Sequence, residues 1–570
     1  MQSLTSDQLS TLTTADIREF SAAQIGQLTT AQVSTLSSDN LSALSSSQTA
    51  GLSSAQVRSL TTDQLNNLST ADVQEFTSAQ ISQLTTAQVA NLSSTNVGAL
   101  TTAQVASLTT AEVQALNSDQ LNALSTADTR ALTAAQVSAL TTSQVSTLSS
   151  DNLSALSSTQ VARLSSSQLQ ALTSDQLNSL STSDIREFSA AQIGQLTTAQ
   201  VSTLSTTNVS ALTTAQEAGL TTSQVNALTT DQISSLSTAQ VTSLNTAQVR
   251  ALTTDQVNAL ATATVQKLTT TQLNALTASQ VSGISSDNLS ALTSSQASSL
   301  TSALVQALTS SQLNALSSSD IREFTNAQIG QLTTAQVSTL STDTVQALST
   351  GQVASLTSAL VQALTSDQLN SLSTADVRAL TTVQVSALTT AQVSTLSTDN
   401  LTALSSAQVS KLTTSQVQSL TTGQVSALAT SQVVGLSTSQ VKALSTDQLG
   451  ALSTTDVRTL STVQVAALTT AQLSGLSTSN LSALASNQVA ALSSAQVRSL
   501  TTDQISSLTT DDVREFTTSQ VSSLTTDQVS GLTTDQLSNL TTAQASVFTS
   551  AQVHAFTTDQ VNAWLTGLSG

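Results

Sequence analysis

The chain contains few groups that do chemistry. It has one histidine, His554, no cysteine and no tyrosine, so all of its side-chain hydroxyls belong to serine and threonine. A hydroxyl becomes a nucleophile when a neighbouring base activates it, and catalysis needs acid, base or metal groups that converge in space. We therefore expect no enzyme activity, no catalytic residue and no small-molecule substrate.

Metal and cofactor sites are equally hard to place. Three Asp-Asn pairs, Asp39-Asn40, Asp151-Asn152 and Asp287-Asn288, carry oxygen ligands of the kind that calcium prefers. Calcium takes six to eight oxygens, commonly from an Asp-x-Asp-x-Asp-Gly loop, and no such loop accompanies the pairs. The 15 glycines are scattered and form no phosphate-binding loop. We interpret the pairs as polar helix starts and predict no metal and no cofactor.

The charge pattern limits the partners. The net charge is −19, only 8% of residues are charged, and the basic residues form no patch. Nucleic-acid binding and attraction to an anionic membrane surface both depend on such a patch. We therefore expect the chain to bind neither. No apolar run approaches the length that crosses a bilayer, so we expect no membrane insertion. Residues 1–10 lack the charged and apolar regions of a secretory signal, so we expect no N-terminal signal peptide.

The dominant feature is an eight-residue repeat. Every eighth residue from Leu4 to Trp564, 71 positions in all, is large and apolar, and no insertion breaks the register. A second apolar column holds Val, Leu or Ile at every eighth residue from Leu9 to Val561, with five exceptions: Thr49, Thr129, Glu217, Ala297 and Ala545. We therefore predict a single continuous array over residues 1–570, with residues 541–570 as its C-terminal cap.

Neither a long helix nor a plain strand suits this pattern. Eight residues advance about 80° beyond two full helical turns, so the leucine column would spiral around one long helix. In a strand, spacings of three and five would place the two columns on opposite faces.

A short helix in each octad fits better. Thr29 begins the pattern Ser/Thr-x-x-Gln, a capping box in which the hydroxyl caps the amide of Gln32 and the Gln32 side chain reaches back. Val33 and Leu36 then share one helical face. Aspartate is frequent just inside the cap, where the helix dipole favours it: Asp63, Asp119, Asp175 and Asp255.

Helices this short need neighbours to be stable. We predict an all-α solenoid, a spiral of very short capped helices with one helix per octad, because stacked repeats share a continuous core. A β-solenoid with 16-residue coils is the alternative.

A longer period sets the coil. The fifth octad residue is usually Gln, but it is Asp or Thr at Asp16, Asp72, Asp128, Asp184, Thr264, Asp320, Asp376, Asp456 and Asp512. Asn or Thr follows three octads later at Asn40, Asn96, Asn152, Asn208, Asn288, Thr344, Asn400 and Asn480. Alternating steps of three and four resemble one face of a helix. If seven octads make two turns and ten make three, there are about 3.4 octads, or about 28 residues, per turn.

The Asp-type octads also define a candidate contact stripe. Its strongest members are Asp16, Arg18, Asp184, Arg186, Asp320, Arg322, Asp512 and Arg514. Tandem duplication of a 56-residue unit explains the spacing, and so does a line of contacts along which two rods pair. Both interpretations remain open.

Two local features stand apart. Glu217 replaces an inward valine, and because burying a charge is costly we expect its side chain to reach solvent. His554 and Trp564 lie near Phe548 and Phe556 in the last octads, which suggests a structural cap or a partner-binding patch.

The motif Leu-Thr-Thr-Ala-Gln-Val-Ser-Thr at residues 28–35 resembles the octad arrays of very large bacterial secreted adhesin-like proteins, some of them labelled haem utilisation or adhesion. The resemblance implies an extracellular or cell-surface stalk or fibre. The haem label finds no support, since one histidine and one methionine are the only candidate iron ligands.

From the repeat and the resemblance we predict a non-enzymatic structural rod, stalk or filament segment that self-associates into fibres. A protein–protein scaffold paired through the Asp/Arg stripe is the alternative. Binding of ice or polysaccharide through regularly spaced rows of Ser/Thr hydroxyls is less favoured, because capping already engages those hydroxyls.

Overall fold

The computed structural model describes residues 1–569, and that range contains seventy helices and no strand. The predicted all-α solenoid with one helix per octad is confirmed. The alternative, a β-solenoid with 16-residue coils, is wrong. The physical reason is the capping box, which satisfies the first amides of a helix in almost every octad and so favours helix at each repeat.

The helices follow the repeat without interruption. One begins at the third residue of every octad, from α1 (Ser6–Ser10) to α70 (Thr558–Ser569). All helices before α70 span four to six residues. The four-residue helices are α3 (Ala22–Ile25), α10 (Ser78–Ile81), α20 (Ser158–Val161), α24 (Ala190–Ile193), α33 (Thr262–Val265), α41 (Asn326–Ile329), α51 (Ser406–Val409) and α68 (Thr542–Ala545).

Helix α25 (Thr198–Thr203) shows how the six-residue helices with a capping box start and stop. The Thr197 hydroxyl accepts from the Gln200 amide at 3.1 Å, and the Gln200 side chain accepts from the Thr197 amide at 2.8 Å. After the helix, Leu204 is extended, with φ −59° and ψ 140°. The next cap residue, Ser205, is extended as well. Two extended residues between helices turn the chain so that successive helices follow a coil.

The chain divides into two compact units, Met1–Ile284 and Ser285–Gly570. The first runs from α1 to α35 (Ala278–Ser282) and the second from α36 (Ser286–Ser290) to α70. A single continuous array over residues 1–570 therefore stays a prediction.

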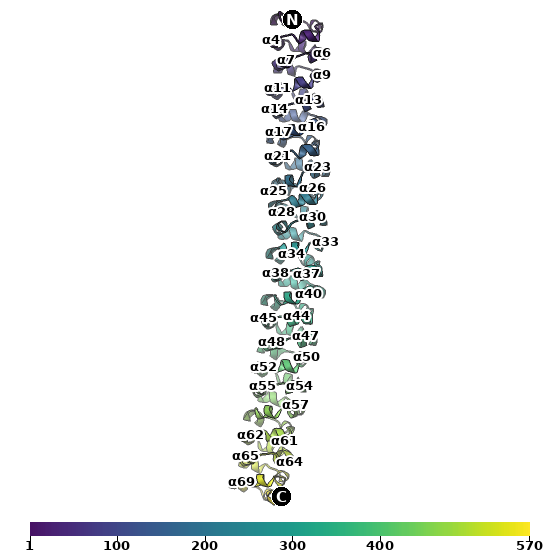
Figure 1. Ribbon diagram of the computed structural model, residues 1–570. Coiled ribbons are helices and arrows are strands. Elements are labelled where there is room, and N and C mark those ends of the chain that lie inside the picture. The colour runs from purple at the N-terminus through teal and green to yellow at the C-terminus, as the bar shows by residue number, and fades with distance from the viewer. Residues whose placement is uncertain (570) are drawn as a thin grey trace. The chain divides into compact units, whose positions relative to one another are not determined.

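Within each unit a helix packs against the third helix along the chain. Helix α11 (Thr86–Asn91) packs on α14 (Thr110–Ala115), and α43 (Thr342–Gln346) packs on α46 (Ser366–Ser371). Figure 1 shows the short helices of each unit following one another in successive coils. Side-chain hydrogen bonds join residues 25, 28 and 31 apart, for example from Asn178 to Thr203 and from Gln176 to Leu148 and Val145. These separations bracket the predicted turn of about 28 residues.

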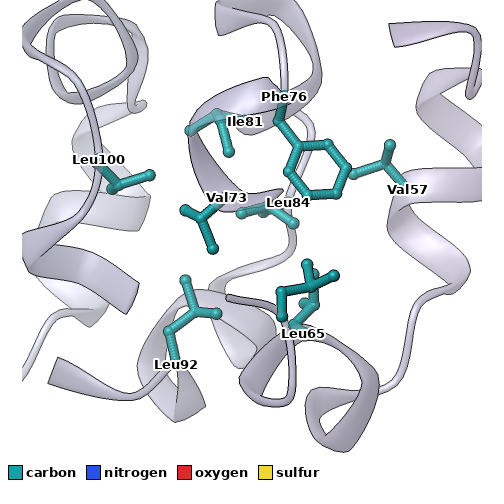
Figure 2. Close-up of a pocket in the computed structure, with 9 residues that line it drawn as sticks. Val57, Leu65, Val73, Phe76, Ile81, Leu84, Leu92 and Leu100 are labelled. Carbon is teal, nitrogen blue, oxygen red and sulfur yellow. The ribbon is translucent and has the colours of Figure 1, made fainter. Parts of the chain in front are cut away.

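Both apolar columns face the interior, as predicted. The second column is buried from Leu9 to Ala545. Most first-column leucines are buried too, with Leu4, Leu12 and Leu92 among the half-buried ones. Figure 2 shows the packing around Phe76, where aliphatic side chains from neighbouring coils converge. Full burial of one such side chain contributes roughly 1.5–3 kcal/mol.

Candidate functional site

The fifth residue of the octad joins one coil to the next. In Gln424 the side-chain oxygen accepts from the Thr421 amide at 2.8 Å. Its Nε2 donates to the Val393 carbonyl at 2.9 Å and to the Leu396 carbonyl at 2.7 Å, 31 and 28 residues earlier. One buried amide therefore caps its own helix and links that helix to the preceding coil.

The same arrangement recurs in both units. Glutamines whose Nε2 bonds carbonyls 28 and 31 residues earlier include Gln64, Gln136, Gln176, Gln232, Gln352, Gln368, Gln440 and Gln528. We call this series the amide ladder. Each such hydrogen bond makes a net contribution of about 0.5–1.5 kcal/mol to the free energy of unfolding. The sequence analysis predicted the cap but missed the link, because the partners lie a whole coil away.

Gln both caps its own helix and bonds the preceding coil, whereas Asp and Asn at this position each do only one of the two. The Asp376 carboxylate accepts from the amide and hydroxyl of Ser373, yet it has no proton to donate to the preceding coil. The Asn400 amide donates to the carbonyl of Leu369 at 3.3 Å, but its side chain is one methylene shorter and makes no capping box with Ser397. Asp376 therefore represents a capping type of octad and Asn400 a linking type.

A second asparagine compensates for the missing cap. Asn370 accepts from the Ser397 amide at 2.7 Å and donates to the Thr395 carbonyl at 2.8 Å. The equivalent pairs are Asn66 with Ser93, Asn122 with Ser149, Asn178 with Ser205 and Asn314 with Ser341. Each of these asparagines precedes a marked Asn or Thr by 30 residues, a pairing visible in the printed sequence that our sequence analysis overlooked.

The stripe aspartates cap their own helices, and three of the stripe arginines bond the following coil. The four aspartates cap their helices at Thr13, Ser181, Ser317 and Thr509. Arg18, Arg186 and Arg322 donate through Nε to the carbonyls of Ala43, Ala211 and Ala347 at 3.0, 2.8 and 2.8 Å. Arg514 is exposed. In residues 1–569 no hydrogen bond joins one Asp/Arg pair to another, so a lateral contact line stays a prediction.

The expectation for Glu217 is wrong. Its side chain is 0% exposed rather than in solvent, because it replaces a valine that points into the closed core. Its Oε1 accepts from the Gln240 side chain at 3.2 Å, whereas Oε2 has no partner. Burial raises the pKa of Glu217 to about 8, and the bond from Gln240 offsets part of that effect. The carboxyl is thus mainly protonated at neutral pH, which avoids a buried charge.

Aromatic side chains gather at the C-terminal end. The rings of Phe548 and Phe556 lie 5.3 Å apart in an edge-on arrangement, and Phe556 lies 5.8 Å from Trp564. Trp564 donates from Nε1 to the Ala545 carbonyl at 2.8 Å. His554 is exposed beside them. This cluster and helix α70 pack onto the preceding coils, and a capping role for residues 541–570 stays a prediction.

Residues 1–569 contain no group of three or more His, Cys, Asp or Glu side chains arranged to hold a metal ion. Within the same range no helix has the length and apolar character needed to span a membrane.

A family model described as the ALTTAQ repeat matches the chain in seventeen overlapping segments, which cover residues 67–262, 305–350 and 361–542. These segments make up more than half of the chain. The chain belongs to the ALTTAQ repeat family. A comparison with curated proteins found no match. The ALTTAQ octad is thus a tandem repeat whose Gln builds the ladder and whose two Thr residues begin each helix, an arrangement consistent with a structural or scaffold role.

The ladder predicts the effect of removing the donors while keeping the cap. We expect Gln424→Glu to lower the free energy of unfolding by about 2–4 kcal/mol at pH 8, because two carbonyls lose their donor and face a carboxylate. Urea unfolding followed by circular dichroism measures the change. Ser426→Ala in the same octad alters an exposed hydroxyl that bonds only Gly423, and it should have little effect. Equal losses in the two variants would contradict the ladder.

Glu217 predicts a pH dependence. Its pKa near 8 in the folded chain exceeds the ordinary value of 4.5, so the unfolded chain loses this proton first as pH rises. The stabilisation from the protonated carboxyl is complete below about pH 4.5 and is lost as pH rises toward 8. Relative to Glu217→Gln, the unmodified chain should lose roughly 2–3 kcal/mol between pH 6 and pH 8. Parallel stability curves for the two proteins would disprove a buried, protonated Glu217.

Proposed function

We propose that this ALTTAQ array is a non-enzymatic rod or stalk segment of a bacterial extracellular or cell-surface protein, which sets the distance between other parts. The amide ladder is the observation that carries the proposal. Every linked coil is bonded to the one before it by the same side chain, and the interior is packed with aliphatic residues. Such an array is stiff along its axis, and each added coil lengthens it by the same amount.

The capping hydroxyls favour this role over binding of ice or polysaccharide. The threonines that begin the helices accept bonds from their own backbone, as Thr421 does from Gln424 at 3.1 Å. Hydroxyls engaged in this way do not present a free, flat lattice to an external surface.

Lateral pairing of rods is a second candidate. A surface groove in the Ser285–Gly570 unit brings Arg458, Asp511 and Asp512 together over successive coils. Opposite charges along one groove suit a second copy in the reverse direction, since each cation would then meet an acid of its partner.

Length should change in proportion to octads. Deleting residues 380–435 removes seven octads in register, and we expect the longest dimension in small-angle X-ray scattering to fall by roughly 16–20 Å, or two coils. Deleting residues 380–431 breaks the octad register and should instead unfold the junction. A compact particle, or a length unchanged by the first deletion, would contradict the rod.

Pairing through the stripe is testable without breaking the coils. Gln74 donates to the Ala99 carbonyl at 3.1 Å just as Arg18 donates to Ala43, so Arg→Gln substitutions should keep this bond and remove the charge. We expect the combined variant Arg18→Gln, Arg186→Gln, Arg322→Gln and Arg514→Gln to sediment as a smaller species than the unmodified chain at low salt. Equal masses would exclude pairing through these arginines, and Arg58→Gln with Arg498→Gln, outside the stripe, serves as the control.

A further inference from the structure

Three exposed valines lie within a short stretch of the Ser285–Gly570 unit. Val383, Val434 and Val463 are 64%, 50% and 65% exposed, and Leu565 is the other exposed large apolar side chain in residues 1–569. Val383 and Val463 occupy the same octad position and are 80 residues apart, which is about three coils. The two valines therefore lie on one side of the unit.

Val434 lies beside the helix that carries Val463. It has the octad position of Asn370, whose side chain bonds main-chain atoms 25 and 27 residues later. For Val434 the corresponding atoms lie just before α58 (Thr462–Ala466), the helix of Val463. Gln464 of that helix also donates to the Val434 carbonyl at 3.4 Å. The two valines are therefore neighbours on successive coils.

A lysine lies beside the first valine. Lys411 has the octad position of Thr395, whose hydroxyl donates to the Ser366 hydroxyl, 29 residues earlier, at 2.6 Å. The residue 29 positions before Lys411 is Thr382, which directly precedes Val383. The exposed side chain of Lys411 therefore starts next to that valine.

A second lysine lies beside the last valine. Lys442 is exposed and lines a surface groove with Ala466 and Ala467, at the end of the helix that carries Val463. The octads that contain the three valines and the two lysines have no Asp or Glu. This side of the unit is therefore apolar and basic. We call it the valine face, and its residues are Val383, Lys411, Val434, Lys442 and Val463.

Exposed aspartates face the other way. Asp367 precedes Val383 by 16 residues, and Asp447 precedes Val463 by the same number. At about 3.4 octads per turn, two octads span about 210°. Each aspartate therefore lies on roughly the opposite side of the coils from its valine.

Further exposed aspartates extend that side. Asp503 follows Asp447 by 56 residues, or about two coils, and Asp399 follows Asp343 by the same distance. The helices that carry Asp343 and Asp367, α43 and α46, pack on each other and so join the two series. We call these five aspartates the acidic face.

We propose that the valine face of one chain docks on the acidic face of a second copy. The lysines then meet aspartates, and the valines leave water against the small Ser, Thr and Ala side chains of the partner. Opposite charges favour this contact, whereas two acidic faces repel each other and two valine faces bring lysines together. Because the faces lie on opposite sides, each bound copy presents a free face to the next, and the contact builds open arrays of rods.

This contact rests on the proposed rod and deepens the lateral pairing named above. It uses none of the stripe arginines. Substitutions in the valine face leave the stripe intact, and the stripe variant leaves the valine face intact, so either contact is able to fail without the other.

Sedimentation velocity of the full chain at low salt tests the contact. We expect the unmodified chain to form larger species as its concentration rises. A valine-face variant should lose them and sediment as a smaller species. Other octads carry Ser or Gln at the substituted positions, so circular dichroism should stay unchanged. The variant combines Val383→Ser, Val434→Ser, Val463→Ser, Lys411→Gln and Lys442→Gln.

A charge-matched control separates the face from net charge. Arg58→Gln with Arg163→Gln removes the same two charges from exposed positions of the Met1–Ile284 unit. This control should sediment like the unmodified chain. A valine-face variant that also sediments like the unmodified chain would overturn the proposal, as would an unmodified chain that stays monomeric at every concentration.

Mixing two variants identifies the partner surface. An acidic-face variant should lose the larger species when alone, yet it should form a one-to-one complex with the valine-face variant, because each protein keeps the face that the other lacks. An acidic-face variant that still associates with itself would show that valine faces pair with each other, and this result would refute the proposed partner. The variant combines Asp343→Asn, Asp367→Asn, Asp399→Asn, Asp447→Asn and Asp503→Asn.

Discussion

The buried glutamine amide at the fifth octad position is the interaction on which the solenoid depends. Helices of four to six residues are far too short to be stable alone, and two aliphatic side chains per octad do not offset the entropy of ordering eight residues. Gln424 places its oxygen on its own cap and both amide protons on the preceding coil. The oxygen and both N–H groups of a buried amide are thereby engaged, which is the condition for burying an amide without penalty.

The substitutions at this position follow from the chemistry of the side chain. Asp376 retains the acceptor and loses the donors. Asn400 retains the donor, but its side chain is too short to accept from the cap residue of its own helix. Where the cap is lost, Asn370 supplies it from the preceding coil. Because each coil contacts only its neighbours, a local loss of this kind stays local, and a neighbouring residue is able to compensate for it.

The same locality explains why a carboxyl is tolerated in the core. Glu217 lies among aliphatic neighbours with one oxygen unpartnered, and its raised pKa keeps it neutral at physiological pH. In a globular core such a residue would disturb many contacts at once. In a stack of coils it affects the few coils that touch it, and the Gln240 side chain offsets part of the cost.

Periodicity and local chemistry determined much of this protein from the sequence alone. The columns that begin at Leu4 and Leu9, the capping box at Thr29 and the spacing of the marked octads predicted short helices, an inward core and a coil of about 28 residues, because these features depend on neighbours within one octad or on the repeat itself. The tertiary structure decided which side chains interact between neighbouring coils. The donors of Gln424, the compensating Asn370 and the burial of Glu217 depend on partners a full coil away in sequence, and local propensity carries no information about which atoms meet there.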